Sequence, residues 1–464
     1  MQDYYGEDTI VALSTPVGKG AIAVIRMSGS LSLDLISRTF SRPIGKDQHR
    51  LAVTGEFYTD EPHRIIDECV VVYFRGPNSY TGEDVIEISC HCNPLIIDQI
   101  IQRLVPGGAR LAQPGEFTKR AYLNHKMDLS QAEAVASVIQ AKTRQGLAYS
   151  MRQLEGGLSE RIHAIKAEIM EIASLIEINL DFNEEDIQVY QKQEVLIRAT
   201  TLVSEIDKLL HTYDYGRLLQ EGIKLLLLGK PNVGKSSLLN ALAEKDRAIV
   251  SDIPGTTRDY LEEYTQIEGF PIQIVDTAGI RETLDMIEEM GVRRALGHIE
   301  TSDLVLAIFD AHQKLDKNDR KFLEYLNNTV RGKVPFLVLL NKIDLGFEKE
   351  TREYLQGLET TIIEVSAKTG KNITGLKKKI NAALTSGNNL EEEDIVITSA
   401  RHKAVMGKAK KALQNFCEGI QQDMDEVILA SELRSGLDHL GQLAGEVTSE
   451  DLLNHIFGEF CIGK

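Results

Sequence analysis

The chain has 464 residues, a length that predicts roughly three folding units at about 150 residues per domain. Hydrophobic residues make up 42% and charged residues 26%, which excludes wholesale disorder and leaves apolar material for several cores. Lys and Arg number 52 against 69 Asp and Glu, and the net charge of −17 repels a distant polyanion, so any contact with a nucleic acid must be local.

The cysteines and the N-terminal residues indicate where the protein works. Cys69, Cys90, Cys92, Cys417 and Cys461 are an odd number without the spacing of a disulfide framework, which favours a reducing compartment. The first ten residues lack the basic and apolar regions of a secretory signal, and no run approaches the roughly 18 apolar residues of a membrane span. We therefore expect a cytoplasmic protein with no membrane partner.

Residues 1–126 have the pattern of an α+β domain. Short strand-like runs at Ala21–Met27, Glu68–Phe74 and Asp84–Cys90 are separated by Gly, Pro and Asn turns. From Met127 the pattern changes, because apolar residues recur at helical intervals with few breakers. This spacing predicts long helices over residues 127–220.

Residues 221–386 have a third pattern, in which the apolar runs KLLLLG, IQIVD, LVLAIFD and PFLVLLN alternate with helical stretches. Such alternation predicts parallel βα units. Helical patterning resumes over residues 387–464. The expected fold class is therefore multidomain, with an α/β domain inserted between two helical segments that pack together as one discontinuous helical domain.

The α/β segment opens with a phosphate-binding motif. Gly229-Lys-Pro-Asn-Val-Gly234-Lys235-Ser236 matches G-x-x-x-x-G-K-[ST], directly after KLLLL and before the helical SSLLNALA. In this motif the glycines let backbone N–H groups cradle phosphate, Lys235 offers its charge to the β and γ oxygens, and Ser236 can ligate Mg²⁺. The alternative is a glycine-rich turn without a ligand, which the motifs that follow disfavour.

Three further motifs select the nucleotide. Asp276-Thr277-Ala278-Gly279 ends the next apolar run, where a carboxylate can hold the outer shell of the metal and a Gly N–H can meet the γ-phosphate. Asn341-Lys342-Ile343-Asp344 follows PFLVLL, and an aspartate there accepts the N1–H and N2–H of guanine, a donor pair that adenine lacks. Ser366-Ala367-Lys368 supplies a backbone contact to the guanine oxygen. The four motifs in order predict a GTPase.

A candidate switch loop lies between the first two motifs, at Ser251-Asp-Ile-Pro-Gly-Thr-Thr257-Arg-Asp259. Thr257 can complete Mg²⁺ coordination only when a γ-phosphate is present, so the order of the loop depends on the nucleotide. Ile280 follows Gly279 where a small signalling GTPase places a glutamine that orients the attacking water, so the reaction needs another group. The acidic candidates, each of which can equally be a surface charge, are Glu282, Asp285, Glu288 and Glu289.

Segments across the whole chain carry a family resemblance. They are TPVGKGAIAVIRMSG, GPNSYTGEDVIEI, QPGEFTKRAYLNHKMDLSQAEA, SDIPGTTRD with the nucleotide motifs, and the terminal FCIGK. With them, the sequence resembles the MnmE (TrmE) family of tRNA-modification GTPases over nearly its full length. The resemblance implies a folate-binding and dimerising N-terminal domain (1–126), a helical domain in two parts (127–220 and 387–464), and an inserted Ras-like P-loop G domain (221–386).

The same resemblance implies an activity and partners. It implies a homodimer whose GTP hydrolysis depends on K⁺ and on dimerisation, and which forms a heterotetramer or larger complex with the flavoprotein MnmG (GidA). The complex would add an aminomethyl-type group at C5 of the wobble uridine (U34) of certain tRNAs, with 5-formyltetrahydrofolate or 5,10-methylenetetrahydrofolate as the one-carbon donor and FAD held by the partner. The alternative is a ribosome-assembly or signalling GTPase without one-carbon chemistry, which leaves the N-terminal segment and FCIGK without a role.

The resemblance also implies site residues. Those that bind GTP are Asn232, Val233, Gly234, Lys235, Ser236, Ser237, Ser251, Asp252, Ile253, Pro254, Gly255, Thr256, Thr257, Asp276, Thr277, Ala278, Gly279, Asn341, Lys342, Asp344, Ser366, Ala367 and Lys368. Among these, the Mg²⁺ ligands are Ser236 and Thr257, and the K⁺ ligands are Asn232, Ser251, Ile253 and Thr256. The resemblance places the catalytic glutamate, which acts through water, on Glu288.

The implied folate positions are Arg26, Glu87, Lys126 and the terminal Lys464. A carboxylate such as Glu87 can accept hydrogen bonds from the N–H edge of a pterin, and the cations suit a glutamate tail. Cys461 is a further catalytic candidate, for tRNA modification rather than GTP hydrolysis, although a thiol there can also be a small buried apolar group.

A basic stretch near the C-terminus is open to two interpretations. Its residues, which fall on a predicted helix, are Arg401, Lys403, Lys408, Lys410 and Lys411. They could contact tRNA phosphate, but a solvated helical face that pairs with nearby acids is the favoured interpretation.

Overall fold

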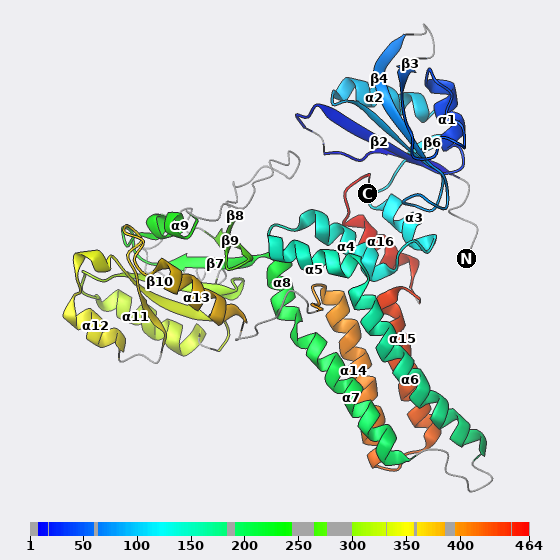
Figure 1. The fold of residues 1–464 in the computed structure, drawn as a ribbon. Helices are drawn as coiled ribbons and strands as arrows, with labels where there is room; N and C mark the ends of the chain where they lie inside the picture. Colours follow the sequence, from blue (N-terminus) through cyan, green and yellow to red (C-terminus); the bar gives the residue numbers. More distant parts are fainter. Residues whose placement is uncertain are drawn as a thin grey trace.

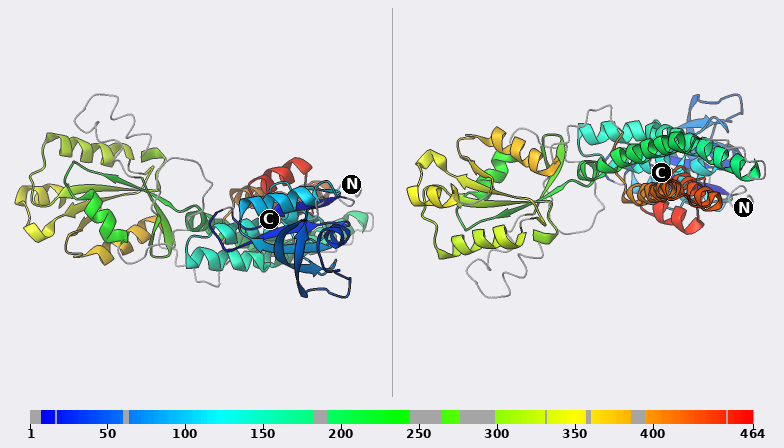
Figure 2. Two further views of the ribbon diagram at one scale, coloured as in Figure 1. Left: turned by 90° about the horizontal axis from the view of Figure 1, so that it is seen from above. Right: turned by 90° about the horizontal axis from the view of Figure 1, so that it is seen from below.

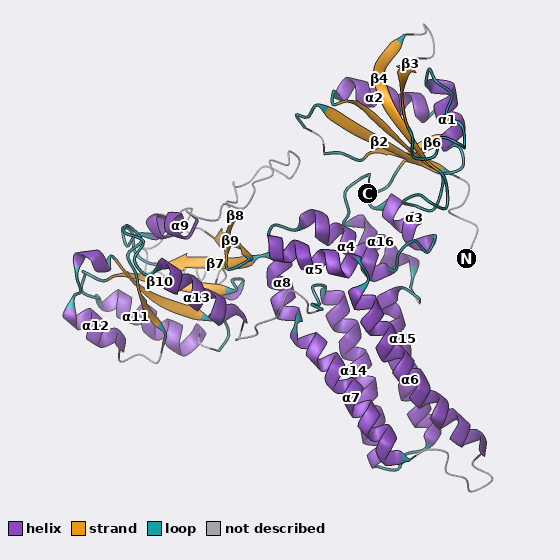
Figure 3. Ribbon diagram, viewed as in Figure 1, coloured by secondary structure: helices purple, strands orange, loops and turns teal. Residues whose placement is uncertain are grey.

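The computed structural model describes residues 8–16, 18–59, 64–182, 191–243, 264–275, 299–330, 332–356, 360–385, 395–446 and 448–463. The described chain forms three bodies, an N-terminal sheet domain, a long helical bundle and an α/β domain (Figure 1). In both views of Figure 2 the α/β domain lies at one end of the molecule, and the other two bodies share the opposite end. Strands are confined to two of the three bodies (Figure 3).

The N-terminal domain has a six-stranded sheet within the described residues, in the order β3-β4-β5-β2-β1-β6. Its elements are β1 (Thr9–Leu13), β2 (Ile22–Ser28), α1 (Ser32–Thr39), β3 (Ala52–Tyr58), β4 (Ile65–Phe74), β5 (Val85–His91), α2 (Pro94–Leu104) and β6 (Ala109–Leu111). Helices α1 and α2 cover one face, because Ile36 and Ile100 share a core with Ile25 and Ile88 of the sheet. The opposite face of β2 and β5 therefore carries the side chains that alternate with this core.

Two short helices join the sheet domain to the bundle. They are α3 (Glu116–Leu123) and α16 (Glu450–Gly458). Gly115, before α3, has φ +65°, and a Cβ there would lie 2.6 Å from the main-chain oxygen of Phe457. Only glycine permits this close approach, so the last helix of the chain is fixed against the start of α3.

The bundle is built from both sides of the α/β domain. Its helices are α4 (Leu129–Gln140), α5 (Arg144–Leu154), α6 (Gly157–Phe182), α7 (Lys192–His211), α8 (Tyr213–Glu221), α14 (Ala400–Gln421) and α15 (Glu426–Ala444). Ile169 of α6 and Ile206 of α7 share one core with Leu413 of α14 and Leu433 of α15. The expected discontinuous helical domain is therefore confirmed, because two segments far apart in sequence bury their apolar faces against each other.

The α/β domain has a six-stranded sheet within the described residues, in the order β12-β11-β10-β7-β9-β8. Its elements are β7 (Ile223–Leu228), α9 (Lys235–Ala243), β8 (Tyr264–Ile267), β9 (Phe270–Val275), β10 (Leu304–Asp310), α11 (Lys317–Tyr325), a π turn (Leu326–Val330), β11 (Phe336–Asn341), a 3₁₀ turn (Ile343–Leu345), α12 (Lys349–Gln356), β12 (Ile362–Glu364) and α13 (Ile373–Thr385). The strands from β9 to β12 in this order are parallel, as predicted.

The edge strand β8 departs from the predicted parallel units, since it runs antiparallel to β9. The two are joined by Glu268 and Gly269, whose φ angles are +49° and +88°. Two consecutive residues with positive φ match the twist of a tight hairpin. The sequence does not announce this turn, because a glutamate is an uncommon residue in that conformation.

The chain leaves the bundle for the α/β domain after α8, and the described residues of its return crossing, which begin at residue 395, lie beside α8. The main-chain N–H of Ile397, on the return crossing, donates to the Thr212 hydroxyl over 3.0 Å. A Cβ on Gly216 of α8 would lie 2.3 Å from the main-chain oxygen of Ile397.

Among the helices of the described ranges, none combines the length and apolar character needed to cross a bilayer.

Candidate functional site

The phosphate-binding motif lies between the end of β7 and the start of α9, as the sequence predicts. A Cβ on Gly229 would lie 2.4 Å from the main-chain oxygen of Ile308, so the loop leaves the sheet where only glycine fits. The Lys235 ammonium donates to the main-chain oxygens of Gly229 (2.6 Å) and Lys230 (3.0 Å), and therefore lies across the loop. Asn232 is exposed with φ +63°, a conformation that asparagine tolerates.

Asn341 joins three of the motifs. Its side-chain amide, 2% exposed, donates to the main-chain oxygen of Val233 over 2.8 Å and accepts from the main-chain N–H of Ala367 over 2.9 Å. Gly234 has φ +98°, and a Cβ there would lie 2.3 Å from the Asn341 amide nitrogen. The phosphate-binding loop and the two guanine motifs are thus parts of one hydrogen-bonded unit.

Asp344 and Ser366 are the residues of this unit that the sequence predicts to lie at the base. The buried Ser366 hydroxyl donates to one carboxylate oxygen of Asp344 over 2.6 Å. This hydrogen bond is the main cause that lowers the pKa of Asp344 below its usual value. The exposed carboxylate is therefore charged at neutral pH and can accept two N–H groups of a guanine ring.

Lys342 is held by a residue that the sequence analysis did not single out. Its backbone has φ +67°, and its ammonium lies 2.7 Å from the buried carboxylate of Asp310. Asp310 is the last residue of β10 and pairs in register with Asn341 of β11. The sequence could have indicated Asp310, because it is the acidic last residue of the strand LVLAIFD and the next strand also ends in a nucleotide motif.

Several predicted site residues lie outside the described residues. They are the switch loop Ser251–Thr257, the motif Asp276–Gly279, the catalytic candidate Glu288 and the terminal Lys464. Ser236 and Ser237 are described and are exposed at the start of α9. Of the predicted ion ligands, the structure therefore places Ser236 and Asn232 in the phosphate-binding motif.

A second candidate site lies on the N-terminal sheet, where Arg26 of β2 and Glu87 of β5 are direct cross-strand partners. The guanidinium donates to one carboxylate oxygen of Glu87 from Nε (2.9 Å) and Nη2 (2.7 Å). It also lies 5.3 Å from the ring centroid of Tyr80 and 5.7 Å from that of Phe117. Two aromatic rings that the sequence analysis did not select therefore lie against the Arg26–Glu87 pair. Of the two, Tyr80 could have been selected, because it lies in the segment GPNSYTGED that carries the family resemblance.

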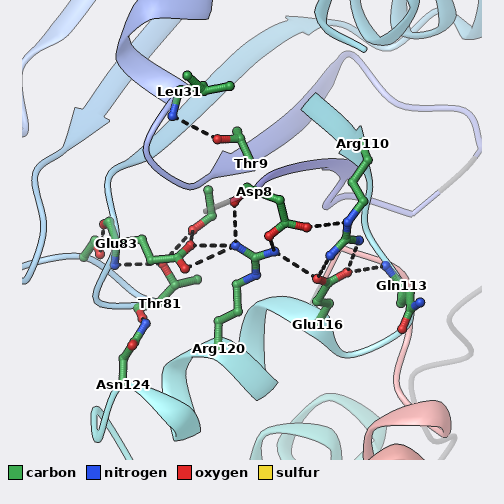
Figure 4. Close-up of polar contacts among 12 residues, drawn as sticks. Asp8, Thr9, Leu31, Thr81, Glu83, Arg110, Gln113, Glu116, Arg120 and Asn124 are labelled. Atoms are coloured by element: carbon green, nitrogen blue, oxygen red, sulfur yellow. Dashed lines mark hydrogen bonds and ion pairs between the residues drawn. The ribbon is translucent and has the colours of Figure 1, made fainter. Parts of the chain in front are cut away.

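The loop that carries Tyr80 is fixed by a buried ionic network (Figure 4). Arg120 of α3, 2% exposed, pairs with Asp8 (2.7 Å), Glu116 (3.0 Å) and Glu83 (3.2 Å). Glu83 also accepts from the Ser28 hydroxyl at the end of β2, over 2.6 Å. The network therefore ties α3 and the Tyr80 loop to the strand that holds Arg26.

Lys126 and the C-terminal residues reach the same domain. The exposed Lys126 ammonium donates to the main-chain oxygen of Pro77, in the Tyr80 loop, over 3.0 Å. Gly463 accepts from the Ser14 hydroxyl over 3.1 Å, and Ser14 pairs with Val24, two residues from Arg26. Cys461 is exposed, so its predicted alternative as a buried apolar group is wrong. The structure thus brings the C-terminal segment to Ser14, just after β1, the strand next to the one that carries Arg26.

The basic stretch on α14 pairs largely with acids of the bundle. Arg401 donates to both carboxylate oxygens of Glu133, over 2.8 and 3.0 Å. Lys410 pairs with Asp207 (2.5 Å), and Lys403 lies 3.4 Å from Asp214. These contacts agree with the favoured interpretation of a helical face that pairs with acids.

Comparisons with known proteins agree with this arrangement. A family model described as the MnmE helical domain matches residues 129–461, and one described as the GTP-binding protein TrmE N-terminus matches residues 9–126. The tRNA modification GTPase MnmE of Aquifex aeolicus (strain VF5) is 41% identical over 458 residues, covering 98% of this chain and 100% of that protein. MnmE of Clostridioides difficile (strain 630) is 41% identical over 463 residues, covering 99% of each. Among solved structures, the G domain of the T. maritima FeoB iron transporter aligns at 25% identity with a TM-score of 0.27, covering 35% of this chain and 98% of that one. The chain belongs to the MnmE family of tRNA modification GTPases.

Proposed function

We propose that this chain hydrolyses GTP and, with the flavoprotein MnmG, installs an aminomethyl-type group at C5 of the wobble uridine U34 of certain tRNAs. The observation that carries the proposal is the presence, in one chain, of two built sites. One is the hydrogen-bonded pair of Asp344 and Ser366, proposed to bind guanine, and the other is the Arg26–Glu87 pair on the N-terminal sheet. The domain ranges 1–126, 127–220 with 387–464, and 221–386 belong to the same proposal.

The GTPase site is proposed to use both described and undescribed residues. Lys235 binds the β and γ oxygens, while Ser236 and Thr257 ligate Mg²⁺. Asn232, Ser251, Ile253 and Thr256 supply oxygens to K⁺, which offsets charge that develops on the transferring phosphoryl group. Glu288 orients the attacking water, a role that Ile280 has no group to fill. The exposed position of Asn232 beside Gly234 supports its part in this set.

The N-terminal site is proposed to bind a tetrahydrofolate that supplies the one-carbon unit. Glu87 accepts from the N–H edge of the pterin, and Arg26, Lys126 and Lys464 provide positive charge for the glutamate tail. The contact of the C-terminal segment with Ser14 supports the inclusion of Lys464, the residue after Gly463. Cys461 is proposed to serve tRNA modification from the same segment.

The assembly is proposed to be a homodimer that binds MnmG, with FAD held by MnmG. Ile22 (65% exposed) and Val70 (36% exposed) lie on the sheet face that α1 and α2 leave open, which supports a protein partner for that face. All five cysteines are free, which supports a reducing, cytoplasmic setting.

The test is nucleoside analysis of total tRNA from a strain that lacks the gene, complemented with wild type, Glu87→Ala, Asp344→Asn or the control Glu160→Ala on the exposed surface of α6. We expect the C5-modified wobble uridine to be lost in the deletion strain, and to be restored by wild type and the control but not by the two site variants. Intact wobble uridines in the deletion strain would contradict the tRNA assignment and favour a GTPase with another client, such as the ribosome.

A further inference from the structure

The β8–β9 hairpin of the G domain packs directly on two helices of the helical domain (Figure 1). The ring of Phe270, the first residue of β9 and 2% exposed, meets Tyr215 of α8 edge-on, with centroids 5.1 Å apart and planes at 81°. Tyr215 meets Tyr149 of α5 in the same way, at 6.3 Å and 86°. The three rings form one buried aromatic contact that spans both domains.

The turn of the hairpin rests against the same helices. A Cβ on Gly269 would lie 2.1 Å from the side-chain oxygen of Gln145, the second residue of α5. The amide nitrogen of Gln145 donates to the Tyr215 hydroxyl over 2.8 Å. Gln145 is therefore held between the turn and the aromatic contact, with its oxygen toward the turn and its nitrogen bound to Tyr215.

The hairpin is also the covalent link between the two motifs that sense the γ-phosphate. β8 follows the switch loop in sequence, and β9 ends at Val275, the residue before Asp276. β9 is parallel to β7 in continuous register, from Ile272 beside Ile223 to Val275 beside Leu226. A displacement of Phe270 along β9 is thus delivered to the residue that precedes Asp276, because a paired strand does not absorb it locally.

From these contacts the geometry points to Gln145, Tyr215 and Phe270 as positioning residues for GTP hydrolysis, through which the helical domain fixes β9, the strand that precedes the Asp276 motif in sequence. The inference rests on the proposed GTPase activity and adds the route by which a second domain controls it. None of the three residues belongs to a nucleotide motif. Reciprocity holds for binding free energies, so a contact that favours the transition state is expected to respond to a bound transition-state analogue, and not to GDP alone.

Simple packing would give a different result from positioning. If the contact only stabilised the fold, its loss would lower the melting temperature and leave turnover per folded molecule unchanged. If it positions β9, its loss lowers kcat while the affinity for GDP, set by the P-loop and the guanine motifs, stays the same.

The test compares Gln145→Met and Phe270→Leu with wild type in the full-length protein. Gln145→Met keeps the length of the side chain and removes the amide, and Phe270→Leu keeps an apolar residue and removes the ring. The matched control is Arg217→Gln, which breaks another contact between the same two domains, the 2.7 Å ion pair of Arg217 with Asp303, without touching the hairpin. Steady-state GTP hydrolysis, GDP affinity and thermal unfolding are measured for each protein.

We expect kcat to fall roughly fivefold or more in both variants, with GDP affinity within about twofold of wild type, and no such fall in Arg217→Gln. Wild-type kcat in Gln145→Met, or an equal fall in the control, would overturn the inference. If Phe270→Leu does not fold, Gln145→Met decides alone. An inactive wild-type protein would instead refute the GTPase assignment on which the inference rests.

A spectroscopic measurement tests the reciprocal direction. The chain contains no tryptophan, so Tyr149→Trp introduces a single emission probe into the aromatic contact. We expect its emission to differ between GDP alone and GDP with aluminium fluoride, and the difference to disappear when Gln145→Met is added. Identical emission in both nucleotide states would contradict the coupling.

Discussion

The Ser366 hydroxyl donates to one carboxylate oxygen of Asp344 over 2.6 Å, although the two residues belong to separate nucleotide motifs. The hydrogen bond orients the carboxylate and lowers its pKa, so Asp344 is a fixed, charged acceptor of the kind that the proposed contact with the N1–H and N2–H of guanine requires.

Asp344→Asn is therefore expected to change the preferred base. An amide offers one acceptor and one donor group, so it mismatches the two donors of guanine and matches the donor and acceptor of xanthine. We expect GTP affinity to fall by roughly 100-fold or more while affinity for xanthosine triphosphate rises. Equilibrium titration with both nucleotides checks this, with Asp438→Asn on the exposed surface of α15 as control. Undiminished GTP affinity would exclude Asp344 as the base-recognition residue.

Glu87→Gln is expected to weaken folate binding. The substitution keeps the shape of the side chain, but it removes the charge that pairs with Arg26 and replaces one acceptor with a donor. We expect the affinity for 5-formyltetrahydrofolate to fall roughly tenfold or more. Isothermal titration measures it, and Lys46→Gln, an exposed cation of the same domain, is the control. Equal affinities for variant and wild type would contradict a folate site at this pair.

Glu288→Ala and a change of monovalent cation test the proposed chemistry. We expect Glu288→Ala to bind GTP as wild type does and to lose most of its hydrolysis, because the attacking water loses its orienting group.

For wild type, we expect faster hydrolysis in K⁺ than in Na⁺, since Na⁺ is too small for an oxygen shell shaped around K⁺. Single-turnover assays in matched chloride salts separate the two. Full turnover in the variant would rule out Glu288, and equal rates in both salts would remove the ion from the mechanism.

Glu133 gives a prediction on stability. Burial alone would raise its pKa, but His402, 2.5 Å away, and Arg401 outweigh burial and hold the pKa of Glu133 at about 2. A carboxyl group whose pKa is lower in the folded than in the unfolded state stabilises the fold above its unfolded pKa, and this stabilisation is lost as the pH falls. The usual pKa is 4.5, so the loss falls between about pH 4.5 and pH 2.

Glu133→Gln is accordingly expected to lower the free energy of unfolding by about 3–5 kcal/mol at pH 7, because it removes the carboxylate that pairs with the partly buried Arg401 and the fully buried His402. Thermal or denaturant unfolding measures the difference between variant and wild type, and the difference should shrink as the pH falls from 4.5 to 3. Glu160→Gln, on an exposed face of α6, should show neither effect. A difference independent of pH would mean that the charge of Glu133 is not what stabilises the bundle.

The sequence predicts the fold and the placement of the described nucleotide motifs at strand ends, because both depend on local patterns. Apolar runs end in Gly229 and Asn341, and their chemistry is readable without a structure. Contacts between remote segments are not encoded locally. Nothing in the periodicity indicates that Gln145 contacts the turn at Gly269. Nor does it indicate that Arg401 forms an ion pair with Glu133 and is therefore not available to tRNA. Those facts follow from packing, which a single sequence does not display.

The hydrogen bond between Ile397 and Thr212 joins the two parts of the helical domain, which the inserted α/β domain separates in sequence. Thr212 and Ile397, which lie on either side of the inserted GTPase domain in sequence, are neighbours in space. Removing or exchanging that domain therefore costs the helical domain almost no loop-closure entropy. We therefore expect the helical domain to fold as a unit whether or not the GTPase domain is inserted in it.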